Sequence, residues 1–190
     1  MKRIAIFASG GGSNARKILE YFREVPDIEV TLVVSNKNNA GVLKHAADFD
    51  VPTYILSRPD FYERTVVVDH LQSLSIDLIV LAGFLWLVPS SMVEAYPDAI
   101  VNIHPALLPK FGGKGMYGKH VHAAVVESQE SETGITIHYV NEQYDDGEHL
   151  YQASCPVLPT DTPEDVAARV LYLEHEHYAV VIDRILRGTL

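Results

Sequence analysis

Short apolar segments alternate with amphipathic ones along roughly the first two thirds of the chain. Apolar segments of this length predict strands that are buried on both faces, as in a parallel sheet covered by helices. The expected strands lie at residues 2–8, 28–36, 52–56, 77–83 and 99–105. Helices are expected between and after them at residues 15–22, 40–48, 61–74 and 120–128.

The last part of the chain has a different pattern. Residues 132–141 and 148–158 alternate apolar and polar positions around a turn-like "EQYDDG", which predicts an antiparallel pair of strands at the end of the sheet. The last helix is expected at residues 163–187, because "TDTPEDV" supplies a cap, a proline in the first turn and acidic residues near the positive end. We therefore expect an α/β fold with one doubly wound, mostly parallel sheet, helices on both faces and an antiparallel edge, as a single domain over residues 1–190.

Composition and charge narrow the class of protein. Hydrophobic residues make up 47% of the 190 positions and charged residues 21%, the ordinary balance of a globular domain. No apolar run is long enough to cross a membrane, and the formal net charge of −10 argues against non-specific nucleic-acid binding. The one cysteine, Cys155, fits a reducing compartment and is expected to be inert core. We therefore predict a cytoplasmic protein that binds neither nucleic acid nor membrane.

The stretch "SGGGSN", residues 9–14, stands between the first expected strand and the first expected helix. The free N–H groups and the dipole of a helix start attract an anion, and glycine lets the anion approach the backbone closely. We therefore favour a phosphate site, with a tight turn capped by Ser13 or Asn14 as the alternative. The stretch also resembles a dinucleotide fingerprint, but the second strand ends without the acidic residue that this fingerprint needs.

The stretch "NIHPALLP", residues 102–109, ends the fifth expected strand. With the two-residue period of a strand, Asn102 and His104 project to the same side, where an amide and an imidazole can bind an oxyanion and exchange a proton. The alternative is that His104 is a buried structural histidine. A later turn, "YDDG", offers two carboxylates, one of which could orient His104, and His138 on the preceding strand could share the site. A turn built from Asp and Gly for its conformation alone is the competing interpretation.

Two further patterns carry less information. Leu85, Trp86, Leu87 and Val88 follow the fourth strand and could line a pocket for a flat heterocycle, or could belong to the core. The pairs "HVH" and "HEH" lie on expected helices, where residues two apart point in different directions, so we expect no metal site.

Taken together, "SGGGSN", "VLAGF", "NIHPALLPKF", "HVHAAV", "GITIHYV", the Asp-Gly turn and "EHEHYAVVI" resemble the phosphoribosylglycinamide formyltransferases of the folate-dependent formyltransferase family. The resemblance covers essentially the whole chain. It implies a Rossmann-like fold and transfer of the formyl group of 10-formyltetrahydrofolate to the glycine amine of phosphoribosylglycinamide in de novo purine biosynthesis. It also implies that the folate is a co-substrate and that no metal takes part. We expect either a monomer or a homodimer, and the sequence does not choose between them.

The resemblance implies a role for individual residues. Asn102, His104 and Asp145 would be catalytic, and Asn102 and Asp145 would also contact the folate. The ribonucleotide would contact Gly12, Ser13, Asn14 and Glu174, the last at its glycinamide end. Further folate contacts would come from Leu85, Trp86, Leu87, Val88, Asn141, Glu142, Gln143 and Tyr144, together with Arg58 or Arg64. The chain departs from the family at Trp86, where arginine is common, and at Asp146, where glycine is usual.

Other functions compete with this one. The same motifs fit another folate-dependent formyl enzyme, either a formyltetrahydrofolate hydrolase or a formyltransferase that acts on a different amine. A non-catalytic nucleotide-binding module would use the glycine turn without the acid–base residues. A nicotinamide-dependent oxidoreductase is the least favoured, because the fingerprint is incomplete.

Overall fold

The computed structural model describes residues 1–190, which form seven strands and seven helices. The strands are β1 (Lys2–Phe7), β2 (Ile28–Ser35), β3 (Thr53–Ile55), β4 (Leu78–Leu81), β5 (Ile100–His104), β6 (Glu132–Tyr139) and β7 (His149–Pro156). The helices are α1 (Ser13–Phe22), α2 (Val42–Asp48), α3 (Arg58–Tyr62), α4 (Val66–Ser73), α5 (Ser90–Ala95), α6 (Lys119–Glu127) and α7 (Pro163–Arg187).

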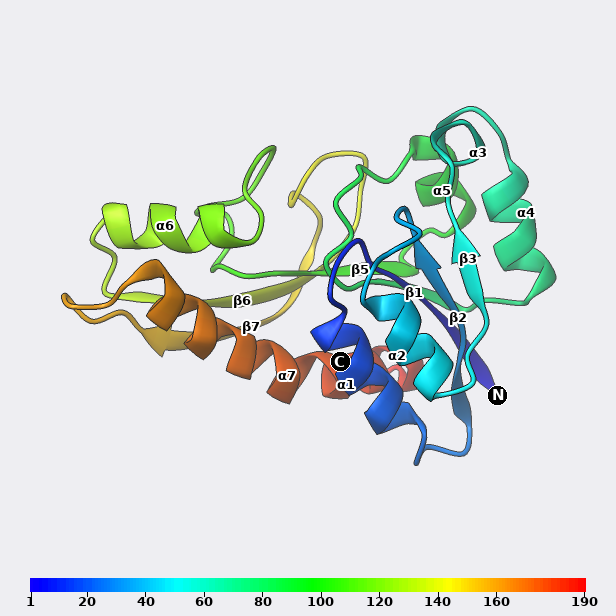
Figure 1. Ribbon diagram of the computed structural model, residues 1–190, viewed down its shortest axis with the longest axis horizontal. Coiled ribbons are helices and arrows are strands. Elements are labelled where there is room, and N and C mark those ends of the chain that lie inside the picture. The colour runs from blue at the N-terminus through cyan, green and yellow to red at the C-terminus, as the bar shows by residue number, and fades with distance from the viewer.

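All seven strands belong to one sheet, in the order β3-β2-β1-β4-β5-β6-β7 (Figure 1). Strands β1 to β5 run parallel, whereas β6 pairs antiparallel with β5 and with β7. The predicted doubly wound, mostly parallel sheet with an antiparallel edge is therefore confirmed. The chain winds outward from β1 in one direction and from β4 in the other, so the crevice where ligands bind in such sheets lies beyond the carboxyl ends of these two strands.

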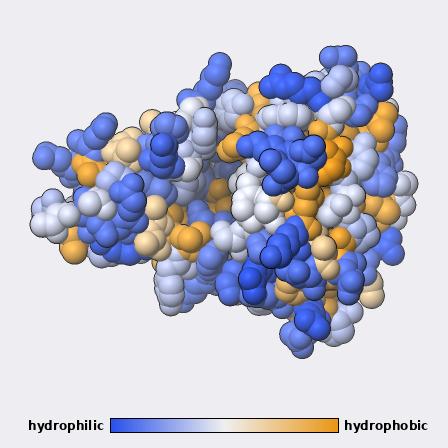
Figure 2. Space-filling model, in the orientation of Figure 1, coloured by the Kyte–Doolittle hydropathy of each residue, from blue (hydrophilic) through white to orange (hydrophobic).

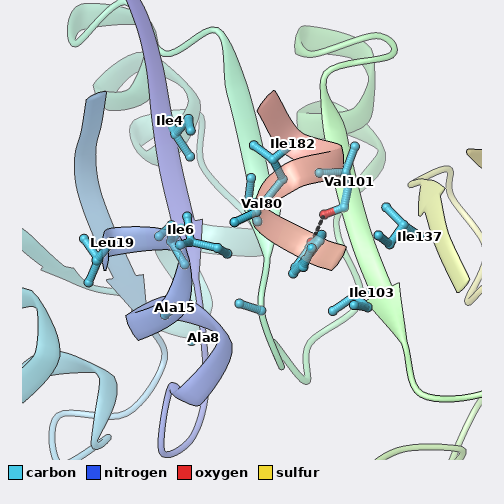
Figure 3. Packing of buried hydrophobic residues seen from close by; sticks show 14 of the residues in the cluster. Ile4, Ile6, Ala8, Ala15, Leu19, Val80, Val101, Ile103, Ile137 and Ile182 are labelled. Carbon is cyan, nitrogen blue, oxygen red and sulfur yellow. Dashed lines mark hydrogen bonds between the residues drawn. The ribbon is translucent and has the colours of Figure 1, made fainter. Parts of the chain in front are cut away.

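Both faces of the sheet are buried, which explains why β4 and residues 4–7 of β1 are apolar at every position. On β1, Ile4 and Ile6 belong to the core formed with α1 and α7, and Phe7 belongs to the core formed with α3, α4 and α5. Figure 3 shows the first of these cores, with Val80 and Val101 of the sheet facing Ile182 of α7.

Two helix predictions need correction. The single helix expected at 61–74 is two helices, because Ser57 caps an earlier start and its Oγ accepts a hydrogen bond from the Asp60 N–H at 3.2 Å. Residues 63–65 are not helical and separate α3 from α4. Helix α5 was missed, since its sequence directly follows an apolar run that gave no helical period.

The two helices next to the site begin differently. Helix α7 matches its predicted bounds, with a capping box between Thr162 and Asp165, and ends at Gly188 in the left-handed conformation. Helix α1 begins at Ser13, and the capping position before it is Gly12, which has a φ of 78° and supplies no side-chain cap, so the alternative of a Ser13 or Asn14 cap was wrong. None of the seven helices is both long and apolar enough to cross a membrane.

Candidate active site

The predicted catalytic residues and the glycine turn lie at one end of the sheet, beyond the carboxyl ends of β1, β4 and β5. Ser9 links the first two strand ends, because its Oγ accepts a hydrogen bond from the Leu85 N–H and its own N–H donates to the Gly83 carbonyl, both at 3.0 Å. The segment between β6 and β7, yellow in Figure 1, reaches the end of β5 through a contact between Asp145 and His104. Figure 2 shows the surface hollowed here, between the lobe that carries α6 and the rest of the molecule.

Strands β5 and β6 bring the amide and two imidazoles together. Asn102 lies directly opposite His138 in the antiparallel register, and His104 lies opposite Thr136. The side chains of His104 and His138 are 3% and 2% exposed, so both are nearly dry. The Nδ2 of Asn102 is 3.1 Å from the Nε2 of His138. The structure therefore places Asn102 and His104 on one side of β5, as predicted, and brings His138 to Asn102, which the sequence had offered as a possible member of the site.

His104 faces a hydrogen-bond acceptor at each ring nitrogen. Its Nε2 donates to the carbonyl oxygen of Phe111 at 2.8 Å, and its Nδ1 is 3.4 Å from Oδ2 of Asp145. A neutral imidazole carries only one N–H, so only the doubly protonated ring can donate in both directions. The surroundings of His104 thus suit an imidazolium next to a carboxylate.

Asp145 is held by several donors at once. It adopts a left-handed backbone conformation with a φ of 54°, and its Oδ2 accepts the Gly113 N–H at 2.9 Å. Burial acts to raise the pKa of Asp145, but the hydrogen bond and the charge of His104, together with the Gly113 N–H, hold the pKa well below its ordinary value. Asp145 is therefore a carboxylate at neutral pH.

The neighbouring Asp146 turns elsewhere. It is exposed and accepts a hydrogen bond from the Asn141 side chain at 3.3 Å, within the turn itself. Of the two candidate carboxylates, the structure brings only Asp145 to the histidines. The turn ends at Gly147, where glycine is required because a side chain would collide with the carbonyl oxygen of Tyr139.

The glycine turn has room for a ligand at two of its three glycines. Gly12 needs to be glycine for the protein itself, since its φ is positive and a Cβ there would lie 2.6 Å from Cβ of Val42. A Cβ on Gly10 or Gly11 would meet nothing within 4 Å. The turn leads into α1, whose first N–H groups have no intrahelical acceptor. The open backbone here is suited to an anion.

A buried acid adjoins this turn. Glu174 on α7 is 9% exposed, and its Oε2 accepts a hydrogen bond from Nδ2 of Asn14 at 2.7 Å. Burial raises the pKa of Glu174, although the bond from Asn14 and the charge of His104 oppose the increase. The Oδ1 of Asn14 is buried without a hydrogen-bond partner in the protein. The predicted ribonucleotide residues Asn14 and Glu174 therefore form one polar pair that lines the turn.

The predicted folate residues divide by exposure. The side chain of Leu85 is exposed, those of Trp86 and Leu87 are half-buried, and Val88 belongs to the core, so only its backbone can meet a ligand. The segment of residues 141–144 is mostly exposed, beside Asp145. Leu85 is hydrogen-bonded to Ser9 and residues 141–144 directly precede Asp145, so both segments lie near the carboxyl ends of the central strands. Their contact with a folate stays a prediction.

The two candidate arginines differ in their contacts. Arg64 forms an ion pair with Asp60 at 3.1 Å and projects into solvent. The guanidinium of Arg58 lies 5.3 Å from the ring centre of Trp86 and 5.6 Å from that of Tyr62, a cation–π arrangement with no acidic partner. Tyr62 in turn donates its hydroxyl to the Leu87 carbonyl at 3.1 Å. Arg58 is therefore the arginine that the structure holds beside the apolar segment.

One buried histidine near the site was not predicted. His122 on α6 is 7% exposed, and burial, followed by the charge of His104, lowers its pKa. Its helical position next to the buried Val121 and Val125 was the sequence signal that could have identified it. His120 on the same helix is exposed, so the two histidines do not converge.

Two further features lie away from this end of the sheet. A cavity of about 370 Å³ lies where the loops before β2 and after α2 meet, and Leu19, Phe22 and Phe49 line it together with charged residues such as Arg23 and Asp48. Cys155 on β7 is half-buried at the margin of the core rather than inside it, and burial raises the pKa of its thiol.

Comparison with known proteins agrees with this geometry. The formyl transferase family matches residues 2–182. A phosphoribosylglycinamide formyltransferase of Haemophilus influenzae is 35% identical over all of this chain and 90% of its own length. The chloroplastic enzyme of that name from Arabidopsis thaliana is 44% identical, and this chain spans 65% of its length.

Solved structures give the same assignment. The glycinamide ribonucleotide transformylase 1 of Symbiobacterium toebii superposes with a TM-score of 0.90 at 34% identity, over 99% of this chain and 89% of that one. The phosphoribosylglycinamide formyltransferase of Bacillus halodurans gives 0.87 at 34% identity, over 97% and 95%. With the family match over residues 2–182, these likenesses show that the chain belongs to the formyl transferase family, among the phosphoribosylglycinamide formyltransferases.

Proposed function

We propose that this chain transfers the formyl group of 10-formyltetrahydrofolate to the glycine amine of phosphoribosylglycinamide, a step of de novo purine biosynthesis. Membership of the family supports the reaction class. The observation that carries the proposal is the contact of His104 with Asp145 beside Asn102, at the end of β5. An amide donor, an imidazole and a carboxylate within one dry cluster are what an acyl-transfer step requires.

The ribonucleotide would bind across the glycine turn. Its phosphate would lie against the open backbone of Gly10 and Gly11, next to Gly12, and would accept hydrogen bonds from the N–H groups of Ser13 and Asn14 at the start of α1. Glu174 would receive the glycinamide end. A ligand hydroxyl or amine there would also give the buried Oδ1 of Asn14 the partner that it lacks within the protein.

The folate would occupy the other side of the hollow. Its flat pterin would lie against the backbone of Leu85 to Val88 and of residues 141–144, which offers hydrogen-bonding groups beside apolar surface. Its acidic tail would meet Arg58, whose guanidinium has no carboxylate partner within the protein. The two ligands would then meet at Asn102, between the turn and the folate segment.

The chemistry follows from the same cluster. The uncharged glycine amine attacks the formyl carbon, forming a C–N bond and a tetrahedral oxyanion. Asn102 donates an amide N–H to this oxygen, and the His104 imidazolium stabilises its charge; a donor of this kind contributes about 3 kcal/mol to the transition state. Asp145 keeps His104 oriented and helps to move a proton from the attacking amine to the folate nitrogen. The bond from the formyl carbon to that nitrogen then breaks and releases tetrahydrofolate.

One assay distinguishes this function from its rivals. The chain is incubated with 10-formyltetrahydrofolate, with and without phosphoribosylglycinamide, and both the formylated ribonucleotide and tetrahydrofolate are measured. We expect the two products in equal amounts, and only when the amine acceptor is present. Release of formate and tetrahydrofolate without the acceptor would instead indicate a hydrolase. Binding of the ribonucleotide without any turnover would indicate a non-catalytic module, and binding of a nicotinamide nucleotide would revive the oxidoreductase.

The remaining expectations stay predictions. We expect both substrates to be small molecules, and we expect neither nucleic acid nor membrane as a partner. We expect residues 1–190 to act as one formyltransferase domain without a metal. We also expect either a monomer or a homodimer, and analytical ultracentrifugation would distinguish the two. The cytoplasm remains the predicted location, on the ground of the single cysteine.

A further inference from the structure

His138 is the member of the cluster to which the proposed mechanism gives no task. Its side chain is 2% exposed, and it stands directly across the strand pair from Asn102. Buried histidines in contact with a reacting group need a stated protonation state, because each ring nitrogen can either donate or accept. The neighbours of His138 determine that state.

Each ring nitrogen of His138 has one polar neighbour at hydrogen-bond distance. Its Nδ1 is 2.8 Å from the carbonyl oxygen of Tyr139, which can only accept, so Nδ1 carries the proton. Its Nε2 is 3.1 Å from Nδ2 of Asn102, which can only donate, so Nε2 presents its lone pair. Oδ1 of Asp145 is 3.7 Å from the same Nε2, beyond hydrogen-bond distance. One neutral tautomer satisfies both close contacts.

We propose that His138 is a positioning residue for Asn102. As the neutral Nδ1–H tautomer it holds one N–H of the Asn102 amide, which directs the second N–H toward the developing oxyanion. This inference rests on the proposed formyl transfer. An unheld amide could rotate, and a misplacement of about 1 Å in a reacting constellation can cost about a hundredfold in rate. A neutral His138 also leaves the Asp145 carboxylate to pair with a single imidazolium, that of His104.

Two substitutions separate the ring nitrogens. In His138→Gln the terminal amide reaches the position of Nε2, and its oxygen can still accept the Asn102 N–H. In His138→Asn the shorter side chain reaches the position of Nδ1, which preserves the bond to the Tyr139 carbonyl but leaves Asn102 without its acceptor. We expect His138→Asn to lower kcat about tenfold or more with both KM values nearly unchanged, and His138→Gln to stay within a few-fold of wild type. The opposite order, or equal losses, would overturn the proposal.

A double-mutant cycle tests whether His138 acts through Asn102. In the background of Asn102→Ala, we expect His138→Asn to have little further effect on kcat, because the amide that it positions is gone. Losses that multiply would show that His138 acts elsewhere. Thr133→Val is the matched control: Thr133 is buried on the same strand, its hydroxyl has no partner, and it does not touch the cluster. This control should keep wild-type kcat and KM.

A readout that is independent of turnover separates this inference from the proposed function. Nitrogen-15 NMR of the imidazole rings in the full chain reports the tautomer of His138, assigned by its loss in His138→Gln. We expect a protonated Nδ1 and an unprotonated Nε2 at neutral pH. A protonated Nε2, or a doubly protonated ring, would overturn the proposal even if the wild-type chain transfers formyl groups. If the chain transfers none while the tautomer is as expected, the proposed function fails, and with it the part given to Asn102.

Discussion

At the scale of single residues, Asp145 and Asp146 are adjacent in the sequence but face different surroundings. Asp145 contacts His104 and His138, and Asp146 contacts only Asn141 at the surface. Asp145→Asn keeps the size of the side chain and removes its charge. We therefore expect folding to survive and kcat to fall by about a hundredfold or more, the range for loss of acid–base assistance. Asp146→Asn should remain close to wild type.

The rate of tetrahydrofolate release at saturating substrates, with a thermal melt to verify folding, measures both variants. A folded Asp145→Asn protein with near-normal turnover would contradict the role of this carboxylate. A severe loss in Asp146→Asn alone would mean that the other aspartate takes part.

Glu174 gives a prediction about pH. Its pKa is raised chiefly by burial, so the folded chain keeps this proton at pH values where the unfolded chain has released it. The stability that follows is present at acidic pH and is lost as the pH rises through the raised pKa. Glu174→Gln cannot ionise and can still accept the Asn14 N–H. We expect the melting temperature of wild type to fall relative to Glu174→Gln as the pH rises above the ordinary pKa of a glutamate. The lowered pKa of Asp145 acts below this range; parallel melting curves for the two proteins would refute the assignment.

At the scale of elements, the glycine turn joins α1 and α2 and is also the proposed phosphate site. Gly12 packs against Val42, so a side chain there would disturb folding and binding together. Gly11 is the cleaner probe, because a Cβ on it meets no protein atom within 4 Å. Gly11→Ala should fold normally and raise the KM for the ribonucleotide about tenfold, equivalent to about 1.4 kcal/mol, without changing that for the folate. A larger effect on the folate KM would place the phosphate elsewhere.

The segment around α3 makes a second prediction at this scale. Arg58 has no acidic partner and lies over Trp86, whereas Arg64 is already paired with Asp60. Arg58→Ala should raise the KM for the folate about tenfold, because a charge-assisted hydrogen bond contributes about 1.5–3 kcal/mol. Arg64→Ala is the matched control and should leave that KM nearly unchanged. Steady-state kinetics with varied folate measures both, and equal effects would argue against Arg58 as the tail contact.

The elements themselves were predictable in unequal degree. Helix α7 carries a cap, a first-turn proline and a terminal glycine, and its bounds could be predicted closely. The break between α3 and α4 could not, because the run from Phe61 to Leu74 keeps helical spacing and the earlier start depends on Ser57. The same interruption between α3 and α4 decides that Arg58, and not Arg64, lies beside Trp86. The contact of Asn102 with His138 depends on the register between β5 and β6, which the sequence alone does not specify.

At the scale of the whole molecule, the site depends on the order of the strands. β1 and β4 are neighbours in the sheet although α1, β2, α2, β3, α3 and α4 separate them along the chain. This order places the turn after β1 next to the segment after β4, and the antiparallel β6 beside β5 brings Asp145 back to His104. Alternation of apolar and amphipathic segments was enough to predict the class of sheet. The resemblance to the family then identified residues that the sheet order brings together.

The most direct test of the central claim follows the formyl carbon itself. The chain is supplied with 10-formyltetrahydrofolate labelled with carbon-13 in the formyl group and with phosphoribosylglycinamide labelled with nitrogen-15 in its glycine amine, and the reaction is followed by NMR. The account predicts a carbon signal split by coupling to nitrogen-15, which reports the new C–N bond, at a rate that falls about a hundredfold or more in Asp145→Asn. Label recovered only as formate, or left on the folate while both ligands bind, would contradict the account.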